Sequence, residues 1–431
     1  MSVEALLTID FGSAFTKVAV RTGWNTGSSL VHGLPLAARE PGFCIPSVVA
    51  RVRGANGERW AFGTEAANQL PGPNVTIYEN WKPGLFGAAA AGGRFTSDEL
   101  TDVATQFFRG LRSAMQEKTS DDDRPELPLR FCIPRLPERD ASREFLSEIL
   151  EASGWKLSPA RPMVYEPESN VLGVLSRGRN VTWSPARQDF TYTPDRSPHL
   201  PRMLDPSLSR AFREGALQEK RGYYGVLVTD VGAFTTDFGY IRFDTSFFTD
   251  YSKPEITTAS YDLGIRQLDD AVLECLSHEA RGVIDRVSSA QWDTCKGQLY
   301  NGMPYQIPKR EGGVVTLGQG KEASAIGDAV LGFAGRVCQA RQEFCESKLT
   351  HAVHAGIPTG GGIMIPAVRQ TLISRIKEEG TTTLHDLLDE DEPRGALSAR
   401  ASERDLERRR VENRDLVRGA SAIGGCSVFF E

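Results

Sequence analysis

Two segments of the chain, about 220 residues apart, share one pattern: an apolar run that ends in aspartate, a turn with glycine, and an alternating strand. The first is VEALLTID-FGSAFT-KVAVR over residues 3–21, and the second is YGVLVTDV-GAFTTDF-GYIRF over residues 224–243. Apolar runs bounded by such turns predict β-hairpins. The turns contain Asp10-Phe11-Gly12 and Asp230-Val231-Gly232, so the sequence predicts two similar halves that face one another.

The stretches around these hairpins alternate between strand and helix patterns. Apolar runs predict strands over 44–52 and 129–133, and 3.6-residue spacing predicts helices over 98–118, from Pro137 to Gly154, and over 325–349. Such alternation is typical of an α/β protein. A length of 431 residues favours two or three domains.

Two stretches depart from this pattern. Residues 176–222 contain five prolines and carry nine basic side chains against five acidic ones, which predicts an inserted loop or a linker, with a basic partner-docking loop as the alternative. Residues 378–415 are highly charged, so we expect a solvated helix or loop there.

The two Asp-x-Gly turns carry residue types that suit a phosphate site. A tight turn without bulky side chains lets backbone N–H groups point at an anion. Gly12 and Gly232 permit that close approach, and Ser13 and Thr235 add hydroxyl donors. Two such turns facing each other would hold the phosphates of a nucleotide from both sides.

Carboxylates at the same turns predict a metal ion. Asp10, Asp230 and Asp237 would repel a phosphate unless a cation lay between them. Because Mg²⁺ dehydrates reluctantly, we expect it to be held largely through water.

A third glycine cluster follows the strand-like run before residue 359. Backbone at Gly360, Gly361 and Gly362 could approach a flat purine or an α-phosphate at a helix N-terminus. The chain contains neither GxxxxGK[ST] nor GxGxxG, so this is not a Walker loop or a dinucleotide fingerprint.

Composition excludes several other classes of function. A net charge of −6 and the lack of interleaved basic and aromatic residues give no support for binding nucleic acid or an anionic membrane. The seven cysteines form no CxxC pair, which favours a reducing cytosol over a disulfide or zinc scaffold. We see no signal peptide and no apolar run of transmembrane length, so we expect a cytoplasmic protein.

On these motifs the chain resembles the actin-like ATPase superfamily, closest to the nucleotide-binding domain of DnaK-type heat-shock chaperones. LLTIDFGSAFTKVAV resembles the first phosphate motif, GVLVTDVGAFTTDFGYI the second, and IPTGGGIMIPAV the adenosine motif. ENWKPGLFG is similar to the segment with the catalytic lysine, and MVYEPESNVLGVL and DLVRGASAIGG resemble the two connecting motifs. The resemblance implies an α/β fold of two lobes, each built on a ribonuclease-H-like mixed sheet, with ATP and Mg²⁺ between them.

The resemblance also implies boundaries. Lobe I covers residues 1–180 with a subdomain insertion at about 46–103, and a Pro-rich basic insert or linker covers 181–222. Lobe II covers 223–431 with a subdomain insertion at about 271–325 and the adenosine loop at 359–366. No client-binding domain is expected after the second connecting motif.

Residue roles follow from the same matches. Asp10, Lys82, Glu166, Asp230 and Thr235 take catalytic roles, and Asp10, Asp230 and Asp237 hold the metal. The nucleotide is expected to contact Gly12, Ser13, Ala14, Lys17, Gly232, Ala233, Phe234, Asp293, Lys296, Gly360, Gly361, Gly362 and Met364.

Three positions depart from the chaperone pattern. Lys17 is typical of actin and plasmid-segregation filament proteins rather than of the chaperones. Phe234 replaces a glycine and is expected to crowd a position with positive φ. Gly297 replaces the arginine that stacks on the base, which weakens the expected preference for ATP over GTP.

We therefore expect an ATP-binding, slowly hydrolysing nucleotide switch that acts through a protein partner or co-chaperone. One alternative is a filament-forming ATPase of the bacterial-actin kind that self-assembles. A second alternative is a nucleotide-sensing pseudo-ATPase, motivated by Phe234 and Gly297.

Overall fold

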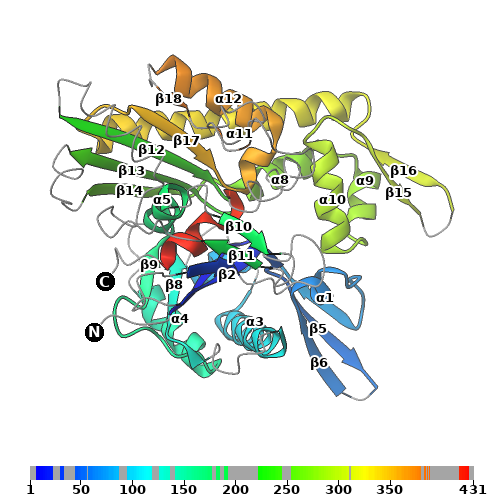
Figure 1. The fold of residues 1–431 in the computed structure, drawn as a ribbon. Coiled ribbons are helices and arrows are strands. Elements are labelled where there is room, and N and C mark those ends of the chain that lie inside the picture. Colours follow the sequence, from blue (N-terminus) through cyan, green and yellow to red (C-terminus); the bar gives the residue numbers. More distant parts are fainter. Residues whose placement is uncertain are drawn as a thin grey trace.

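Two mixed β-sheets form the framework of the chain (Figure 1). The computed structural model describes residues 6–22, 30–33, 44–55, 57–86, 95–118, 126–135, 141–176, 181–184, 189–192, 222–244, 254–309, 312–379, 383–384, 386, 388 and 417–426. The first sheet has the order β10-β11-β3-β2-β1-β8-β9, and the second has the order β14-β13-β12-β17-β18. The predicted α/β class is confirmed.

The first sheet begins at the N-terminal hairpin. Its strands are β1 (Leu6–Phe11), β2 (Phe15–Thr22), β3 (Leu30–Gly33), β8 (Leu129–Ile133), β9 (Met163–Tyr165), β10 (Val181–Ser184) and β11 (Asp189–Tyr192), and β4 (Ile45–Pro46) pairs with β2. The second sheet contains β12 (Tyr223–Val231), β13 (Thr236–Asp244), β14 (Glu255–Tyr261), β17 (Ala355–Thr359) and β18 (Thr383–Leu384). Both hairpins predicted from the sequence, β1–β2 and β12–β13, are confirmed.

The two sheets repeat one topology. In each, three antiparallel strands come first in the chain (β1–β3 and β12–β14), and two parallel strands then extend the other side of the first strand. A helix joins the two parallel strands, α4 (Ala141–Ala152) in one half and α12 (Pro366–Glu378) in the other. A further helix follows each last strand: α5 (Glu166–Ser176) and the helix over residues 417–425. The weak repeat in the sequence is therefore a repeat of supersecondary structure.

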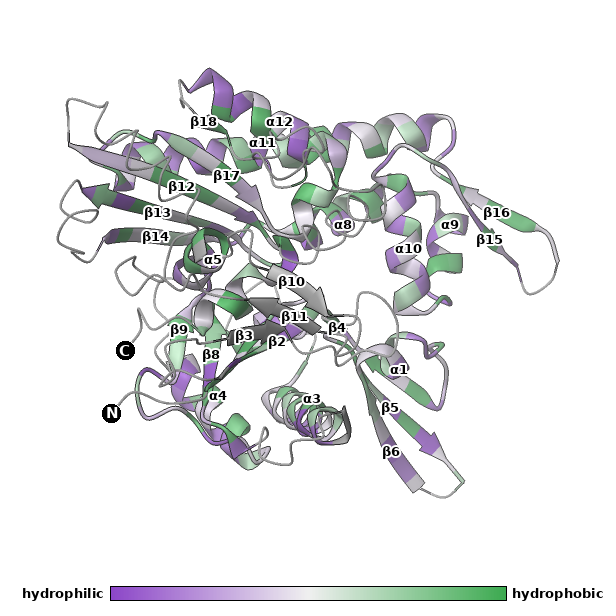
Figure 2. Ribbon diagram, viewed as in Figure 1, coloured by the Kyte–Doolittle hydropathy of each residue, from purple (hydrophilic) through white to green (hydrophobic). Residues whose placement is uncertain are grey.

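Buried apolar runs explain the central strands. All six residues of β1 and nearly all of β12 are buried, as expected for strands that have neighbours on both sides and helices on the faces. The helix α3 (Ser97–Lys118) buries Phe107, Phe108 and Leu111 against the first sheet and leaves its polar side outward. Figure 2 shows hydrophobic and hydrophilic residues mixed along α3, as expected for a helix with one face on a core. The helix α11 (Lys321–Lys348) covers the second sheet in the same way.

Smaller units interrupt each half of the chain. Strands β5 (Val49–Gly54), β6 (Gly57–Phe62) and β7 (Val75–Tyr78) form a separate sheet beside α1 (Gly63–Ala67), followed by α2 (Lys82–Leu85). In the second half, α8 (Ile265–Cys275), α9 (His278–Ile284) and α10 (Ser289–Leu299) precede the hairpin of β15 (Tyr305–Pro308) and β16 (Val314–Leu317). Figure 1 shows these two groups on the same side of the molecule, and α1 contacts α10.

The structure differs from the sequence analysis in two stretches. The single strand expected over 44–52 is divided into β4, which pairs with β2 in the first sheet, and β5, which pairs with β6 and β7 in the separate sheet. Within the expected insert, residues 181–184 and 189–192 form the antiparallel strands β10 and β11, which extend the first sheet through β3. Residues 193–221 and 389–415 lie outside the described residues.

All seven cysteines are free thiols. Among the described residues, no helix combines the length and apolarity needed to cross a bilayer.

Candidate functional site

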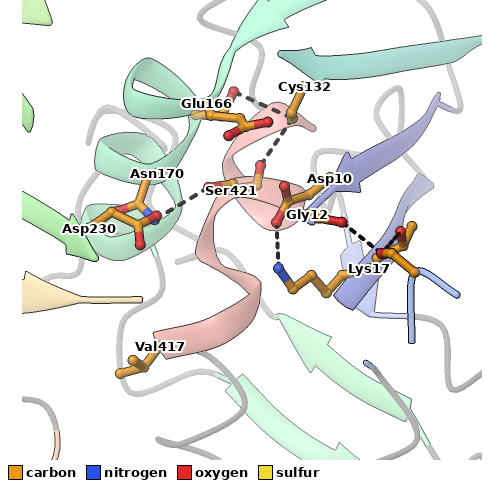
Figure 3. Close-up of polar contacts among 12 residues, drawn as sticks. Asp10, Gly12, Lys17, Cys132, Glu166, Asn170, Asp230, Val417 and Ser421 are labelled. Atoms are coloured by element: carbon orange, nitrogen blue, oxygen red, sulfur yellow. Dashed lines mark hydrogen bonds and ion pairs between the residues drawn. The ribbon is translucent and has the colours of Figure 1, made fainter. Parts of the chain in front are cut away.

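The aspartates of the two hairpins occupy equivalent positions. Asp10 lies near the end of β1 opposite Lys17 on β2, and Asp230 lies near the end of β12 opposite Asp237 on β13. The Nζ atom of Lys17 is 3.1 Å from the Oδ2 atom of Asp10 (Figure 3). The Nδ2 atom of Asn170, in α5, donates to Oδ2 of Asp230 at 2.6 Å. Charges on Lys17, Asp10 and Glu166 also act on Asp230, so the two strand ends and the start of α5 lie close together. The repeat in the sequence thus builds a single cluster.

The two hairpin turns need glycine for space. A Cβ on Gly12 would lie 2.3 Å from the carbonyl oxygen of Phe15, and one on Gly232 would lie 2.8 Å from that of Thr235. Neither glycine has a positive φ, so close approach of the chain explains both positions. The Oγ atom of Ser13 is buried and has no hydrogen-bond partner among the described residues, as expected for a donor whose acceptor is a ligand.

Lys82 and Glu166 form a buried ion pair. The Nζ atom of Lys82 is 2.5 Å from Oε1 of Glu166, and the two residues are 3% and 7% exposed. Lys82 is the first residue of α2, and Asn80, two residues earlier, has a φ of 54°. Between them, Trp81 is buried, with its ring centroid 4.7 Å from that of Phe11. This sharp change of direction places Trp81 in the core and Lys82 on Glu166. The predicted lysine and glutamate are therefore brought together.

Burial raises the pKa of three carboxyl groups in the cluster. It raises the pKa of Glu166 to about 8, although Lys82 lowers it, and the pKa of Asp230 to about 7, although Lys17 lowers it. For Asp237, burial and the charge of Asp230 raise the pKa to about 7, against the hydrogen bonds from Ser260 and Thr235. These carboxyl groups repel one another and are compensated only in part by the two lysines.

Burial lowers the pKa of Lys17, but the charge and hydrogen bond of Asp10, together with the charges of Cys44 and Asp230, more than offset that effect, so the pKa of Lys17 is raised overall. The ammonium group therefore stays charged beside the first turn.

This cluster has the donor set expected for Mg²⁺. Its oxygen atoms come from carboxylates and from an unpartnered hydroxyl, and its negative charge exceeds its positive charge. In the described part of the chain, no three histidine, cysteine or acidic side chains are arranged to ligate one metal ion directly.

The third glycine cluster packs against the second hairpin. Gly360 has a φ of 90°, and a Cβ there would lie 2.1 Å from Oδ1 of Asp230. A Cβ on Gly362 would lie 2.4 Å from a methyl group of Val231, whereas one on Gly361 would meet nothing within 4 Å. Gly361 and the partly buried Met364 both belong to the short 3₁₀ helix η5 (Gly361–Met364). The structure therefore brings this loop to Asp230, as the sequence predicts.

Other predicted positions have different surroundings. Lys296 forms ion pairs of 2.9 Å with both Asp293 and Asp269, and Asp269 also accepts a hydrogen bond from Tyr300. Lys296 therefore anchors α10 to α8. Gly297 faces open space, since a Cβ there would meet nothing within 4 Å.

The expectation that Phe234 crowds a position with positive φ is wrong. Neither Ala233 nor Phe234 has a positive φ, and the ring of Phe234 is buried beneath the guanidinium group of Arg266. Space is instead limiting at Gly264, the residue before α8, where a Cβ would lie 2.5 Å from the carbonyl oxygen of Ala233. The carbonyl oxygen of Ala14 accepts a hydrogen bond of 2.9 Å from the backbone N–H of Ser47.

Sequence reasoning missed the residues that join the C-terminal helix to the cluster. Asn170 on α5 contacts both Asp230 and Ser421. Arg21 and Arg130 donate hydrogen bonds of 2.8 and 2.7 Å to the carbonyl oxygens of Cys426 and Gly425, at the end of the helix over 417–425. No local pattern marks these residues, because their partners lie from 60 to 405 residues away in the chain.

No protein-family model matches this chain, and a search of curated proteins finds no significant match.

Proposed function

We propose that the chain is an ATP-binding protein with the two-lobed fold of the actin-like ATPases, each lobe built on a ribonuclease-H-like mixed sheet. The repeated topology supports this, because it brings equivalent strand ends, with Asp10 and Asp230, to one site. That convergence is the observation on which the proposal chiefly depends. The glycine turns at 12 and 232 and the loop at 360–362 then take the phosphates and the nucleoside.

The cluster suits phosphoryl transfer to water. That reaction depends on positioned phosphates and stabilised charge more than on covalent chemistry. Asp10, Asp230 and Asp237 would hold Mg²⁺ through water, and the ion supplies neutralisation of phosphate charge. Glu166 orients the attacking water and takes its proton, while Lys82 fixes Glu166 and offers charge to the γ-phosphate. A buried, paired glutamate is consistent with slow turnover.

We propose further that the nucleotide state is signalled to a protein partner or co-chaperone in the cytoplasm. The free thiols suit a reducing compartment. The two halves meet at α5 and the helix over 417–425, so ligand contacts to both halves would bias their relative orientation.

A filament-forming ATPase is the second candidate. Lys17 supports it, because its ammonium group lies beside the first turn, 3.3 Å from where a Cβ on Gly12 would be. In that function Lys17 would contact phosphate, and ATP would promote self-assembly.

Phosphate release and pelleting, measured in the same samples with Mg·ATP, test the proposal. We expect the purified chain to bind ATP and to release phosphate, with Lys82→Ala and Glu166→Gln slowing release by about 100-fold. Lys348→Ala, at the exposed end of α11, is the matched control and should leave the rate unchanged. Rates that are unchanged in both site variants would exclude the catalytic assignment. ATP-dependent pelleting would favour the filament, and binding without release or pelleting would favour a nucleotide sensor.

A further inference from the structure

Asn170 lies between the second hairpin and the C-terminal helix. Its Nδ2 atom donates to Oδ2 of Asp230 at 2.6 Å and to Oγ of Ser421 at 3.3 Å (Figure 3). Asn170 is 2% exposed and Ser421 is 4% exposed. The amide therefore joins the carboxylate cluster to the helix over 417–425.

The other end of this amide lacks a partner. Oδ1 of Asn170 is buried and accepts no hydrogen bond from any described residue. Buried polar atoms are nearly always hydrogen-bonded, so an unpartnered one needs a physical explanation. Rotating the amide by 180° would not satisfy it, because an oxygen would then face the carboxylate of Asp230.

No described side chain donates to this oxygen. Lys82 is bonded to Glu166, and Lys17 is bonded to Asp10. The donor can therefore be a water or a ligand group, and the site beside Oδ1 is lined by the charges that act on Asp230. Water bound to Mg²⁺ is such a donor, and Mg²⁺ keeps several of its waters when it binds to carboxylates.

We propose that Asn170 is a positioning residue of the metal site, holding Asp230 through Nδ2 and a metal-bound water through Oδ1. This inference rests on the proposed function only in naming Mg²⁺ as the ion. Ser421 fixes the amide from the C-terminal helix, so the metal site contacts both helices that join the two halves. Residues that orient metal ligands commonly change metal affinity by 10- to 100-fold when they are removed.

Binding of Mn²⁺ without nucleotide tests the proposal, with free Mn²⁺ followed by its electron paramagnetic resonance signal. We expect Asn170→Ala to weaken Mn²⁺ binding by about 10-fold. Asn301→Ala is the matched control: it removes the same amide at an exposed position after α10, where Nδ2 donates to the carbonyl oxygen of Gly297, so a change below about 2-fold is expected. Asp230→Asn should abolish binding and so locate the ion.

A second variant separates a metal role from a packing role. Asn170→Leu keeps the branched shape of the side chain and leaves no cavity, so it should fold even if Asn170→Ala does not, and it should weaken Mn²⁺ binding equally. Mn²⁺ affinity within 2-fold of the parent in the folded variants would overturn the inference, as would binding that survives Asp230→Asn or a parent chain that takes up no Mn²⁺.

ATP binding, measured in parallel, keeps the two proposals distinct. Mn²⁺ binding that depends on Asn170 in a chain that does not bind ATP would support the inference and overturn the nucleotide function. If the chain binds ATP but its Asn170 variants retain full Mn²⁺ affinity, the nucleotide function would be supported and this inference overturned.

Discussion

The backbone nitrogen of Gly173 lies 2.5 Å from the position that a Cβ on Gly424 would occupy. The same Cβ would lie 1.7 Å from the carbonyl oxygen of Ser169, and a Cβ on Gly173 would lie 1.8 Å from that of Ala420. The helix α5 and the helix over 417–425 therefore touch backbone to backbone. This contact holds Glu166 and Asn170 on one helix against Ser421 on the other.

Gly424→Ala is expected to lower the free energy of unfolding by about 1–3 kcal/mol, because the added methyl group overlaps the backbone of α5 and the helices must separate. Urea denaturation gives the measurement. Gly332→Ala is the control, since Gly332 is exposed on α11 with nothing within 4 Å of its Cβ position, and it should raise stability by about 0.5–1 kcal/mol. Equal effects of the two substitutions would mean that helix propensity alone matters at Gly424.

Glu166 was predicted only from the resemblance to the chaperone family. Local sequence pattern was enough to predict the hairpins, α3 and the meeting of Asp10 and Asp230. Their signals are short range: an apolar run, a glycine turn, or a 3.6-residue spacing. Asn170 and Ser421 could not be found in this way, because they are 251 residues apart and only the tertiary fold joins them. The pair of strands β10 and β11 was missed for a related reason, since its edge position comes from pairing with β3 across the chain.

Stability in the absence of divalent cations should fall as pH rises from 5 to 8. The pKa of Asp230 and of Asp237 is about 7 in the folded chain, against an ordinary value of 3.8. Between these values the folded state binds more protons than the unfolded state, so the free energy of unfolding decreases with pH. Below 3.8 the contribution is fully present, and it is lost as pH passes 7.

Urea denaturation in EDTA at pH 5.5, 6.5 and 7.5 measures this slope. Asp237→Asn removes one of the titrating groups, so its slope should be smaller than that of the parent chain. A parent chain whose stability rises across this range would contradict the expected direction.

Asn80 sets the direction of the chain just before Lys82. Its φ of 54° is accessible to glycine and asparagine but costs a β-branched residue about 1–2 kcal/mol. We expect Asn80→Gly to change the free energy of unfolding by only a few tenths of a kcal/mol and Asn80→Val to lower it by about 1–2 kcal/mol. Denaturation curves of the two variants give the comparison, and similar values for both would show that φ at this position is not the limiting factor.

Gly360 and Gly361 are adjacent but face different surroundings, which makes them a matched pair. Gly360→Ala places a methyl group 2.1 Å from Oδ1 of Asp230 at a φ of 90°, so Asp230 or the loop must move. It should lower both the free energy of unfolding, by about 1–3 kcal/mol, and the affinity for Mg·ATP. Gly361→Ala meets no atom within 4 Å and should leave stability within about 0.5 kcal/mol of the parent. Denaturation and calorimetric titration of both variants separate the effects. Weaker nucleotide binding in Gly361→Ala alone would mean that the ligand itself occupies the open space beside that residue. Weaker nucleotide binding in Gly360→Ala alone would mean that the loop acts through Asp230.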